Sequence, residues 1–279
     1  MRTVAFVLSL ALGAQPQIAA SRIALVTATA GTRALVDLGV DDFVVEEGGA
    51  AREILDVHVA DYPLVVLLDN GAETPGEIDA IREAAARFVS RVGERGVAVG
   101  TLADPAAMVA SFDDDRATVL AEIRRVPAKP SSRLAPLDAV AGAVRMIHEI
   151  GSPFSAVVII SARAIAPSEL GSADLLTEIV DSRAAVHVIA RRAPAAPEPD
   201  PSPQGAPDVL GELATLTHGQ YTTIYSPASY AIALDRLADR LAAEMMIQYL
   251  APASGSSGAD VRVGVKIPGA KVTGLGVSR

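Results

Sequence analysis

The most informative segment of this chain is Leu64-Val65-Val66-Leu67-Leu68-Asp69. Five consecutive apolar residues that follow a proline and end at an acid are typical of a parallel strand buried on both faces of its sheet. We therefore expect helices on both sides of this strand. Asp69 should lie at its carboxyl end, and in open α/β sheets this edge is where ligands bind.

Helical and extended patterns alternate downstream of this strand. Apolar residues at 3.6-residue spacing predict two long helices, over 77–92 and 136–150. Shorter helices are predicted to include Val119 to Ile123, Leu175 to Val180 and residues 208–217. Further strands are predicted at 97–102, 156–160, 185–190 and 220–224, and a hairpin turn at 103–105 predicts an antiparallel strand over 108–112. This alternation predicts an α/β core.

Two details of the helices follow from single residues. Asp113 is expected to cap the helix that carries Val119, and the run Asp113-Asp114-Asp115 is interpreted as a solvated helix start favoured by the helix dipole. A last helix is predicted over 228–246, with an inward stripe of Leu234, Leu237, Leu241 and Met245.

The two ends of the chain differ from the core. Met1-Arg2 and the apolar run Thr3 to Gly13, followed by small residues, predict a signal peptide over residues 1–20, too short to cross a bilayer of about 30 Å as a helix. A β segment is expected over 21–60, the α/β domain over 61–250, and a β tail over 251–279 that contains the alternating strand Val261 to Ile267. The proline-rich stretch 193–207 is predicted to be an exposed loop. We expect export to the periplasm or the extracellular space, with no membrane span after cleavage.

Composition narrows the possible functions. The chain has 279 residues, no Cys or Trp, and a net charge of −9, so general attraction to nucleic acid or to an anionic membrane is disfavoured. The absence of cysteine excludes disulfides, thiolate metal sites and thiol nucleophiles. Neither G-x-S-x-G nor a glycine-rich phosphate loop occurs. The four histidines are expected to be structural, and His187, inside an apolar strand, is expected to be a hydrogen-bonded core residue.

The order of elements around Asp69 resembles the von Willebrand factor type A (VWFA) domain. The segment Asp42-Phe43-Val44-Val45-Glu46-Glu47-Gly48 is similar to a D-F-x-V-x-E-D-G stretch before this domain in a group of exported bacterial proteins, and Gln248-Tyr249-Leu250 is similar to the start of that group's C-terminal β tail. The resemblance implies a doubly wound, mostly parallel, Rossmann-like sheet with one antiparallel edge strand.

In that family a metal-ion-dependent adhesion site holds a divalent cation through a D-x-S-x-S motif, a Thr from a later loop and an Asp after the fourth strand. The corresponding motif here is Asp69-Asn70-Gly71-Ala72-Glu73, Leu134 falls near the Thr position and Ala162 at the Asp position. Mg²⁺ requires about six oxygens, and only the first ligand is retained. We therefore expect a degenerate site with no cofactor; weak Mg²⁺ binding by Asp69 and Glu73 is the less favoured alternative, and a structural role for Asp69 within the turn is preferred.

Two functions from different classes remain. The favoured one is a non-enzymatic adhesion-type module that binds an unknown protein or cell-surface partner through the loops 70–76, 128–134 and 161–168 at the carboxyl edge. The alternative is an envelope hydrolase or nucleotide-binding enzyme that uses Asp69 and Glu73 as acid and base. The missing third catalytic group favours the binding module. The candidate binding residues are Asp69, Asn70, Gly71, Glu73, Thr74, Ser131, Ser132, Ser161 and Arg163.

Overall fold

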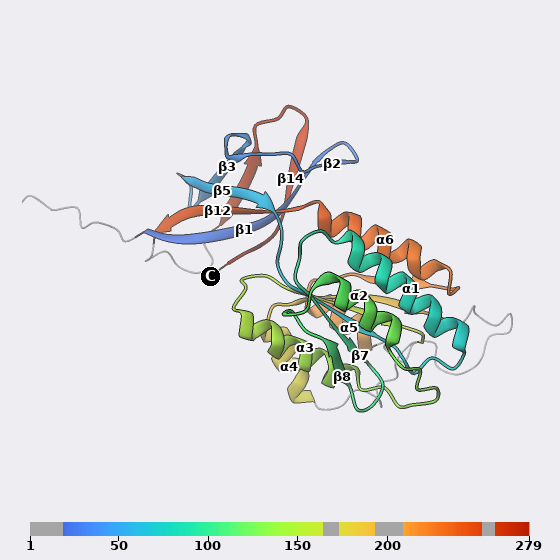
Figure 1. Ribbon diagram of the computed structural model, residues 1–279. Helices are drawn as coiled ribbons and strands as arrows, with labels where there is room; N and C mark the ends of the chain where they lie inside the picture. Colours follow the sequence, from blue (N-terminus) through green and yellow to red (C-terminus); the bar gives the residue numbers. More distant parts are fainter. Residues whose placement is uncertain (1–18, 164–172, 193–208, 253–259, 279) are drawn as a thin grey trace, which may run out of the picture.

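The computed structural model describes residues 19–163, 173–192, 209–252 and 260–278, which form an α/β part and a β part (Figure 1). The strands of the α/β part are β6 (Leu64–Leu68), β7 (Val97–Thr101), β8 (Ala107–Ala110), β9 (Ala156–Ser161), β10 (Ala185–Arg191) and β11 (Tyr221–Ile224). Its helices are α1 (Pro75–Arg91), α2 (Arg116–Arg125), α3 (Pro136–Ile150), α4 (Ala173–Asp181), α5 (Val209–Leu216) and α6 (Ser229–Ala242).

The six strands of the α/β part form one sheet in the order β11-β10-β9-β6-β7-β8. Neighbouring strands are parallel except at β8, which runs antiparallel to β7. The predicted doubly wound sheet with one antiparallel edge strand is therefore confirmed. The fully buried β6 lies inside it, with strands on both sides.

Alternate residues of β6 point into two apolar cores. Leu64, Val66 and Leu68 pack in the core that includes α1, α2 and α6, whereas Val65 and Leu67 pack in the core that includes α3 and α5. In Figure 1, α1 and α6 lie side by side on one face of the sheet, and α3 and α4 lie together on the other. Both faces are covered, so every residue of β6 is apolar.

The β part contains two smaller sheets. The first has the order β14-β1-β12-β5, with β2 also paired to β1, and the second has the order β13-β3-β4. Their bounds are β1 (Ala19–Ala30), β2 (Arg33–Leu35), β3 (Phe43–Glu47), β4 (Ala50–Arg52), β5 (Ile54–Val59), β12 (Glu244–Pro252), β13 (Val261–Val265) and β14 (Ala270–Val277), with a 3₁₀ helix at Val40–Asp42. Phe43, Val45, Ile247 and Tyr249 lie in the core of this part.

The α/β part is inserted between two neighbouring strands of the β part. The chain leaves β5 to form β6 and returns from α6 into β12, and β5 and β12 are antiparallel neighbours. The Ala60 N–H donates to the Glu244 carbonyl at 2.8 Å where the two connections pass. The β segments expected separately at the two ends of the chain therefore form a single unit.

A buried charged cluster lies at this junction. The Arg95 guanidinium lies 4.1 Å from the centre of the Tyr62 ring and donates to the Leu241 carbonyl at 2.7 Å. The Tyr62 hydroxyl donates to Glu244 Oε2 at 2.5 Å, and this oxygen lies 3.8 Å from Arg95. Burial raises the pKa of both Tyr62 and Glu244. The cluster ties the loop after α1 to the start of β12.

Two predictions about the helices are wrong. The helix expected over 228–246 ends at Ala242, and Met245 lies in β12, where it packs in the core of the β part. β12 pairs with both β1 and β5, and these backbone hydrogen bonds override the helical spacing. The N-cap of α2 is Asp115 and not Asp113: the Asp115 carboxylate accepts the Thr118 N–H at 2.7 Å.

Several predictions fall outside the described residues. They concern almost all of the expected signal peptide, the proline-rich loop 193–207 and residues 164–168 of the third carboxyl-edge loop. In the part of the chain that the structure describes, no helix has the length and apolar character needed to span a membrane.

Candidate interaction site at the carboxyl edge

Asp69 follows β6 directly and its side chain is fully buried. Its Oδ1 accepts the Gly71 N–H at 2.9 Å, and its Oδ2 accepts the Ala162 N–H at 2.9 Å. The Ser161 hydroxyl oxygen lies 3.4 Å from the same Oδ2. Burial raises the pKa of Asp69, against the opposing effect of these hydrogen bonds. The carboxyl group therefore links the loop after β6 to the loop after β9, in keeping with the structural role preferred from the sequence.

Asn70 links two more loops to this edge, the loop after β7 and the loop after α2. Its amide nitrogen donates to the Pro127 carbonyl at 3.0 Å, and its amide oxygen accepts the Ala103 N–H at 3.1 Å. Its main-chain carbonyl accepts the Lys129 N–H at 2.7 Å. Because Asn70 is buried, these hydrogen bonds fix the loops after β7 and α2 against the end of β6.

Leu134 fills the space beside Gly71. A Cβ atom on Gly71 would lie 3.0 Å from Leu134 Cδ2 and 3.3 Å from Asp69 Oδ1, closer than ordinary contacts allow. Leu134 is fully buried, and its backbone pairs with Ala103. The apolar side chain of Leu134 thus occupies the space into which a side chain at position 71 would extend.

The remaining predicted residues lie nearer the surface. Glu73, Thr74, Ser131 and Arg163 are exposed, and Ser132 is half-buried. Thr74 is the N-cap residue of α1. The structure therefore divides the predicted site into a buried frame, formed by Asp69, Asn70, Gly71 and Ser161, and an outer rim of exposed side chains.

Sequence reasoning missed a second group at this edge, formed by the buried residues Glu77 and Tyr230 with the half-buried Arg191. The Glu77 carboxylate forms an ion pair with Arg191, whose Nη2 lies 2.7 Å from Oε2. The buried Tyr230 hydroxyl donates to the Ser161 carbonyl at 3.0 Å and lies 3.2 Å from Glu77 Oε1. These residues connect α1, β10 and α6 to the frame around Asp69. The only sequence signal was an acid in the first turn of a helix, which the helix dipole alone explains.

Comparisons with known proteins bear on the fold. No protein-family model and no curated protein matches the sequence. Among solved structures, "von Willebrand factor type A from Catenulispora acidiphila" matches with a TM-score of 0.50 and 15% identity over 85% of this chain and 72% of that one. The α/β part has the von Willebrand factor A fold.

Two further structures are similar to this chain. Proximal thread matrix protein 1 from the mussel byssus matches with a TM-score of 0.50 and 13% identity over 70% of this chain and 49% of its own. The conserved hypothetical protein BatB from Bacteroides thetaiotaomicron matches with a TM-score of 0.48 and 13% identity over 65% of this chain and 98% of its own. At these identities the comparisons show the fold alone.

The residues at the tip of β6 in this von Willebrand A-type domain do not fit a divalent cation. Both oxygens of Asp69 already accept backbone N–H groups, and Gly71, Leu134 and Ala162 carry no side-chain oxygen. Mg²⁺ needs about six oxygens in near-octahedral array. Across the described ranges, no three Asp, Glu or His side chains gather in a way that would hold a metal ion.

Proposed function

We propose that this chain is an exported, non-enzymatic binding module whose von Willebrand A-type domain recognises a protein at the cell envelope through the rim of its carboxyl edge. The observation that carries the proposal is the double use of Asp69 as a buried acceptor for Gly71 and Ala162. A residue that would otherwise reach a ligand instead holds two loops in place. The rim around it is therefore a fixed surface, and a preorganised surface loses less entropy on binding a partner.

Metal independence is part of this proposal. Leu134 packs against Gly71, so a side chain that offers oxygen at position 71 would fit only if Leu134 shifted away from it. Binding would then depend on direct contacts from rim side chains, without a bridging cation. Chelation of divalent ions should leave partner binding unchanged.

The charges on the rim favour a partner that presents carboxylates. In the described parts of the three carboxyl-edge loops, Lys129, Arg133 and Arg163 are basic and Glu73 is acidic. Asp104, in the neighbouring loop after β7, lies 3.7 Å from Arg133 and offsets its charge. The rim is thus basic on a chain whose net charge is −9, and complementary charge steers association and selects partners.

The proposal excludes the alternative in which Asp69 and Glu73 act as acid and base. Asp69 is 0% exposed and both its oxygens accept N–H groups, whereas a general base must come within about 3 Å of a substrate proton. Ester, phosphate and glycoside panels with the purified chain should show no turnover. A rate that disappears on Glu73→Gln substitution would support the enzyme instead.

Export is proposed from the apolar run Thr3 to Gly13 and the small residues that follow it. Mass spectrometry of the chain purified from the envelope fraction of the producing cells should find an N-terminus close to residue 20. A cytoplasmic chain that retains Met1 would refute export without affecting the binding proposal.

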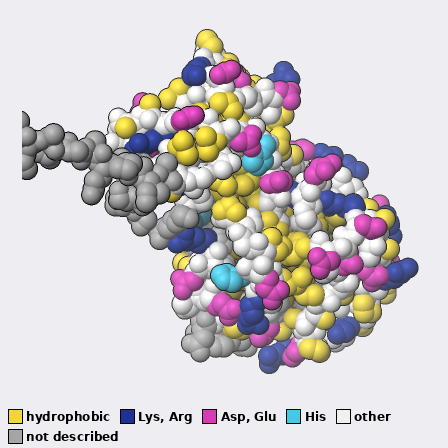
Figure 2. Space-filling model, turned by 60° about the vertical axis from the view of Figure 1, so that its left-hand side comes forward, with side chains coloured by type: hydrophobic (Ala, Val, Ile, Leu, Met, Phe, Trp, Pro, Cys, Tyr) yellow, Lys and Arg dark blue, Asp and Glu magenta, His cyan; other side chains and the backbone are white. Residues whose placement is uncertain are grey.

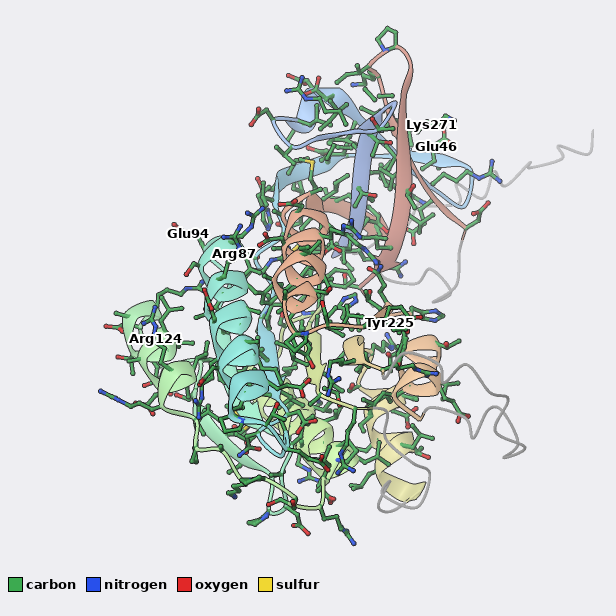
Figure 3. The ribbon with its side chains drawn as sticks, turned by 90° about the vertical axis from the view of Figure 1, so that its right-hand side faces the viewer. Glu46, Arg87, Glu94, Arg124, Tyr225 and Lys271 are labelled. Carbon is green, nitrogen blue, oxygen red and sulfur yellow. The ribbon has the colours of Figure 1, made fainter. Side chains whose placement is uncertain are left out.

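Site-specific photo-cross-linking tests the rim directly. A photoreactive residue at Ser131 or at Thr74 should cross-link the same envelope protein, with and without EDTA. The same residue at Glu94, which is exposed beyond the C-terminal end of α1 (Figure 3) and next to the amino end of β6, is the control and should not capture that protein. Arg163→Glu should weaken the cross-link. Capture that requires divalent cations, or equal capture from position 94, would refute the proposed surface.

A further inference from the structure

A groove lies between the α/β part and strand β14, at the edge of the main sheet opposite to the rim. It is lined by residues at the amino ends of β9 and β10, among them Ser155 and Ala185, and by the C-terminal ends of α4 and α5. The groove has a volume of about 660 Å³, which is within the range of small-molecule sites, about 300–1,000 Å³. Figure 2 shows hydrophobic side chains gathered at the waist between the two parts.

One wall of the groove is built by a β-bulge. Along β1, Leu25 is opposite Gly276 and Val26 is opposite Gly274, so Leu275 is an extra residue in β14. A bulge re-aims side chains and is frequent beside functional sites. Leu275 lines the groove and stays 39% exposed. A Cβ on Gly276 would lie 3.2 Å from Phe154 Cε1, so the glycine lets the Phe154 ring pack against the strand.

The opposite wall is also apolar and also exposed. Leu216, at the end of α5, lines the groove and is 44% exposed. Leu216 and Leu275 belong to different parts of the molecule, yet they line the same groove. A ligand with an apolar body would cover the exposed side chains of both leucines. Burying their apolar surface is favourable by about 25 cal/mol per Å².

The charged residues of the groove are mostly basic. Arg183 and Arg240 line it together with His187 and His218, and the only acid among the lining residues is Glu244. Glu244 is buried and accepts the Tyr62 hydroxyl. Arg240 donates to the neutral Gln220 amide oxygen at 2.8 Å, and no ion pair to Arg183 occurs among the described residues.

Two further observations define the charge that the groove favours. Burial and the positive charge of Arg240 lower the pKa of His187 to about 4, so this ring is neutral near pH 7. The guanidinium groups of Arg183 and Arg240 then remain to attract an anion, and the charge of Arg240 is partly offset because Glu244 interacts with it electrostatically. With one of the two cations partly offset, the groove favours a singly charged carboxylate over a phosphate monoester.

We propose that this groove binds a small amphipathic carboxylate, with the apolar body between Leu216 and Leu275 and the carboxylate at Arg183 and Arg240. The site is separate from the rim and does not depend on the proposed protein partner. Its ligand would contact both the α/β part and the β part, and would therefore stabilise their packing by binding only when both are folded.

Fluorescence of 8-anilinonaphthalene-1-sulfonate with the full chain provides the test. The probe should bind saturably and be displaced by octanoate, about tenfold less well by octanol, and not by octylamine. Leu275→Asp and Arg183→Glu should each weaken probe and octanoate binding by about tenfold or more, as expected for loss of a charge-assisted contact or an apolar wall. Both side chains are exposed, so the variants should keep the parent circular dichroism spectrum.

Matched controls are available on other surfaces. Ile232→Asp replaces an apolar residue on α6 that is 56% exposed, and Arg124→Glu replaces an exposed arginine on α2; both should bind the probe within twofold of the parent chain. Absence of saturable binding, equal displacement by octylamine, or equal weakening in the controls would overturn the proposal. A dimer that dissociates on Leu275→Asp substitution, without anion binding, would assign the groove to a second copy of the chain instead.

Discussion

Replacement of Asp69 by alanine tests whether this carboxyl group is a structural acceptor. The change leaves the buried N–H groups of Gly71 and Ala162 without the oxygens that accept them at 2.9 Å. Each unsatisfied buried donor costs about 1–3 kcal/mol, which gives about 2–6 kcal/mol for the pair. Removal of a buried carboxyl group, whose pKa is raised by desolvation, offsets part of this cost. We expect a loss of about 2–4 kcal/mol in the free energy of unfolding.

Urea denaturation followed by far-ultraviolet circular dichroism measures this loss. Glu73→Ala, an exposed carboxylate on the same loop, is the matched control and should change the free energy of unfolding by less than about 0.5 kcal/mol. Asp69→Asn keeps one acceptor oxygen and should lie between the parent chain and Asp69→Ala. The midpoint of the parent chain should be the same in millimolar Mg²⁺ and in EDTA.

Two outcomes would contradict the structural role. A loss below about 1 kcal/mol for Asp69→Ala would show that the two N–H groups do not depend on this carboxyl group. A parent chain that Mg²⁺ stabilises, with the effect abolished in Asp69→Ala, would show that Asp69 is a metal ligand, because a cation that binds only the folded state raises its stability.

Three further predictions concern stability elsewhere in the molecule. The pKa of His187 is about 4 in the folded chain and about 6.5 in the unfolded chain. The neutral ring therefore contributes fully to the free energy of unfolding above pH 6.5, and this contribution, up to about 3 kcal/mol, is lost as the pH falls to 4. In urea titrations at several pH values, His187→Gln should reduce the dependence of the free energy of unfolding on pH between 6.5 and 4. An unchanged dependence would contradict this role of His187. Asp115→Ala should lower the urea midpoint through loss of the cap to Thr118, whereas Asp113→Ala should leave the midpoint almost unchanged. Gly219→Ala would place Cβ 1.9 Å from the Val186 carbonyl oxygen and should lower the thermal midpoint sharply, at a cost of at least about 3 kcal/mol; a melting curve like the parent's would exclude this close approach.

The elements of the α/β part could be read from local patterns. A run such as Leu64 to Leu68 is compatible with only a few environments, since five consecutive apolar residues must be covered on both faces. The helix at 136–150 was predicted with the bounds that the structure gives, because Gly151 adopts the left-handed conformation that ends it. His187 was expected to be a hydrogen-bonded core residue, and its Nδ1 accepts the Gln220 N–H at 3.1 Å.

The site was predicted only in part. The apolar strand pattern placed Asp69 at the carboxyl edge, and the resemblance to the von Willebrand factor A domain pointed to Leu134 and Ala162 as residues without oxygen at the positions of two metal ligands. It did not reveal Tyr230, Glu77 and Arg191, which come from three separate elements and join the Asp69 frame through the hydrogen bond from the Tyr230 hydroxyl to the Ser161 carbonyl. Contacts between side chains distant in sequence have no local periodicity that would predict them.

The amino-acid sequence by itself determined where the buried strands and amphipathic helices lie, because hydrophobic spacing is a property of neighbouring residues. Only the tertiary structure decided that Glu244 to Pro252 is a strand, because its state depends on pairing with β1 and β5 from the other end of the chain. The same long-range pairing joins the two terminal β segments into one unit and brings Leu275 to the groove that Leu216 also lines. Backbone hydrogen bonds between distant segments form only when the whole chain is folded, and for that reason they override local helix propensity.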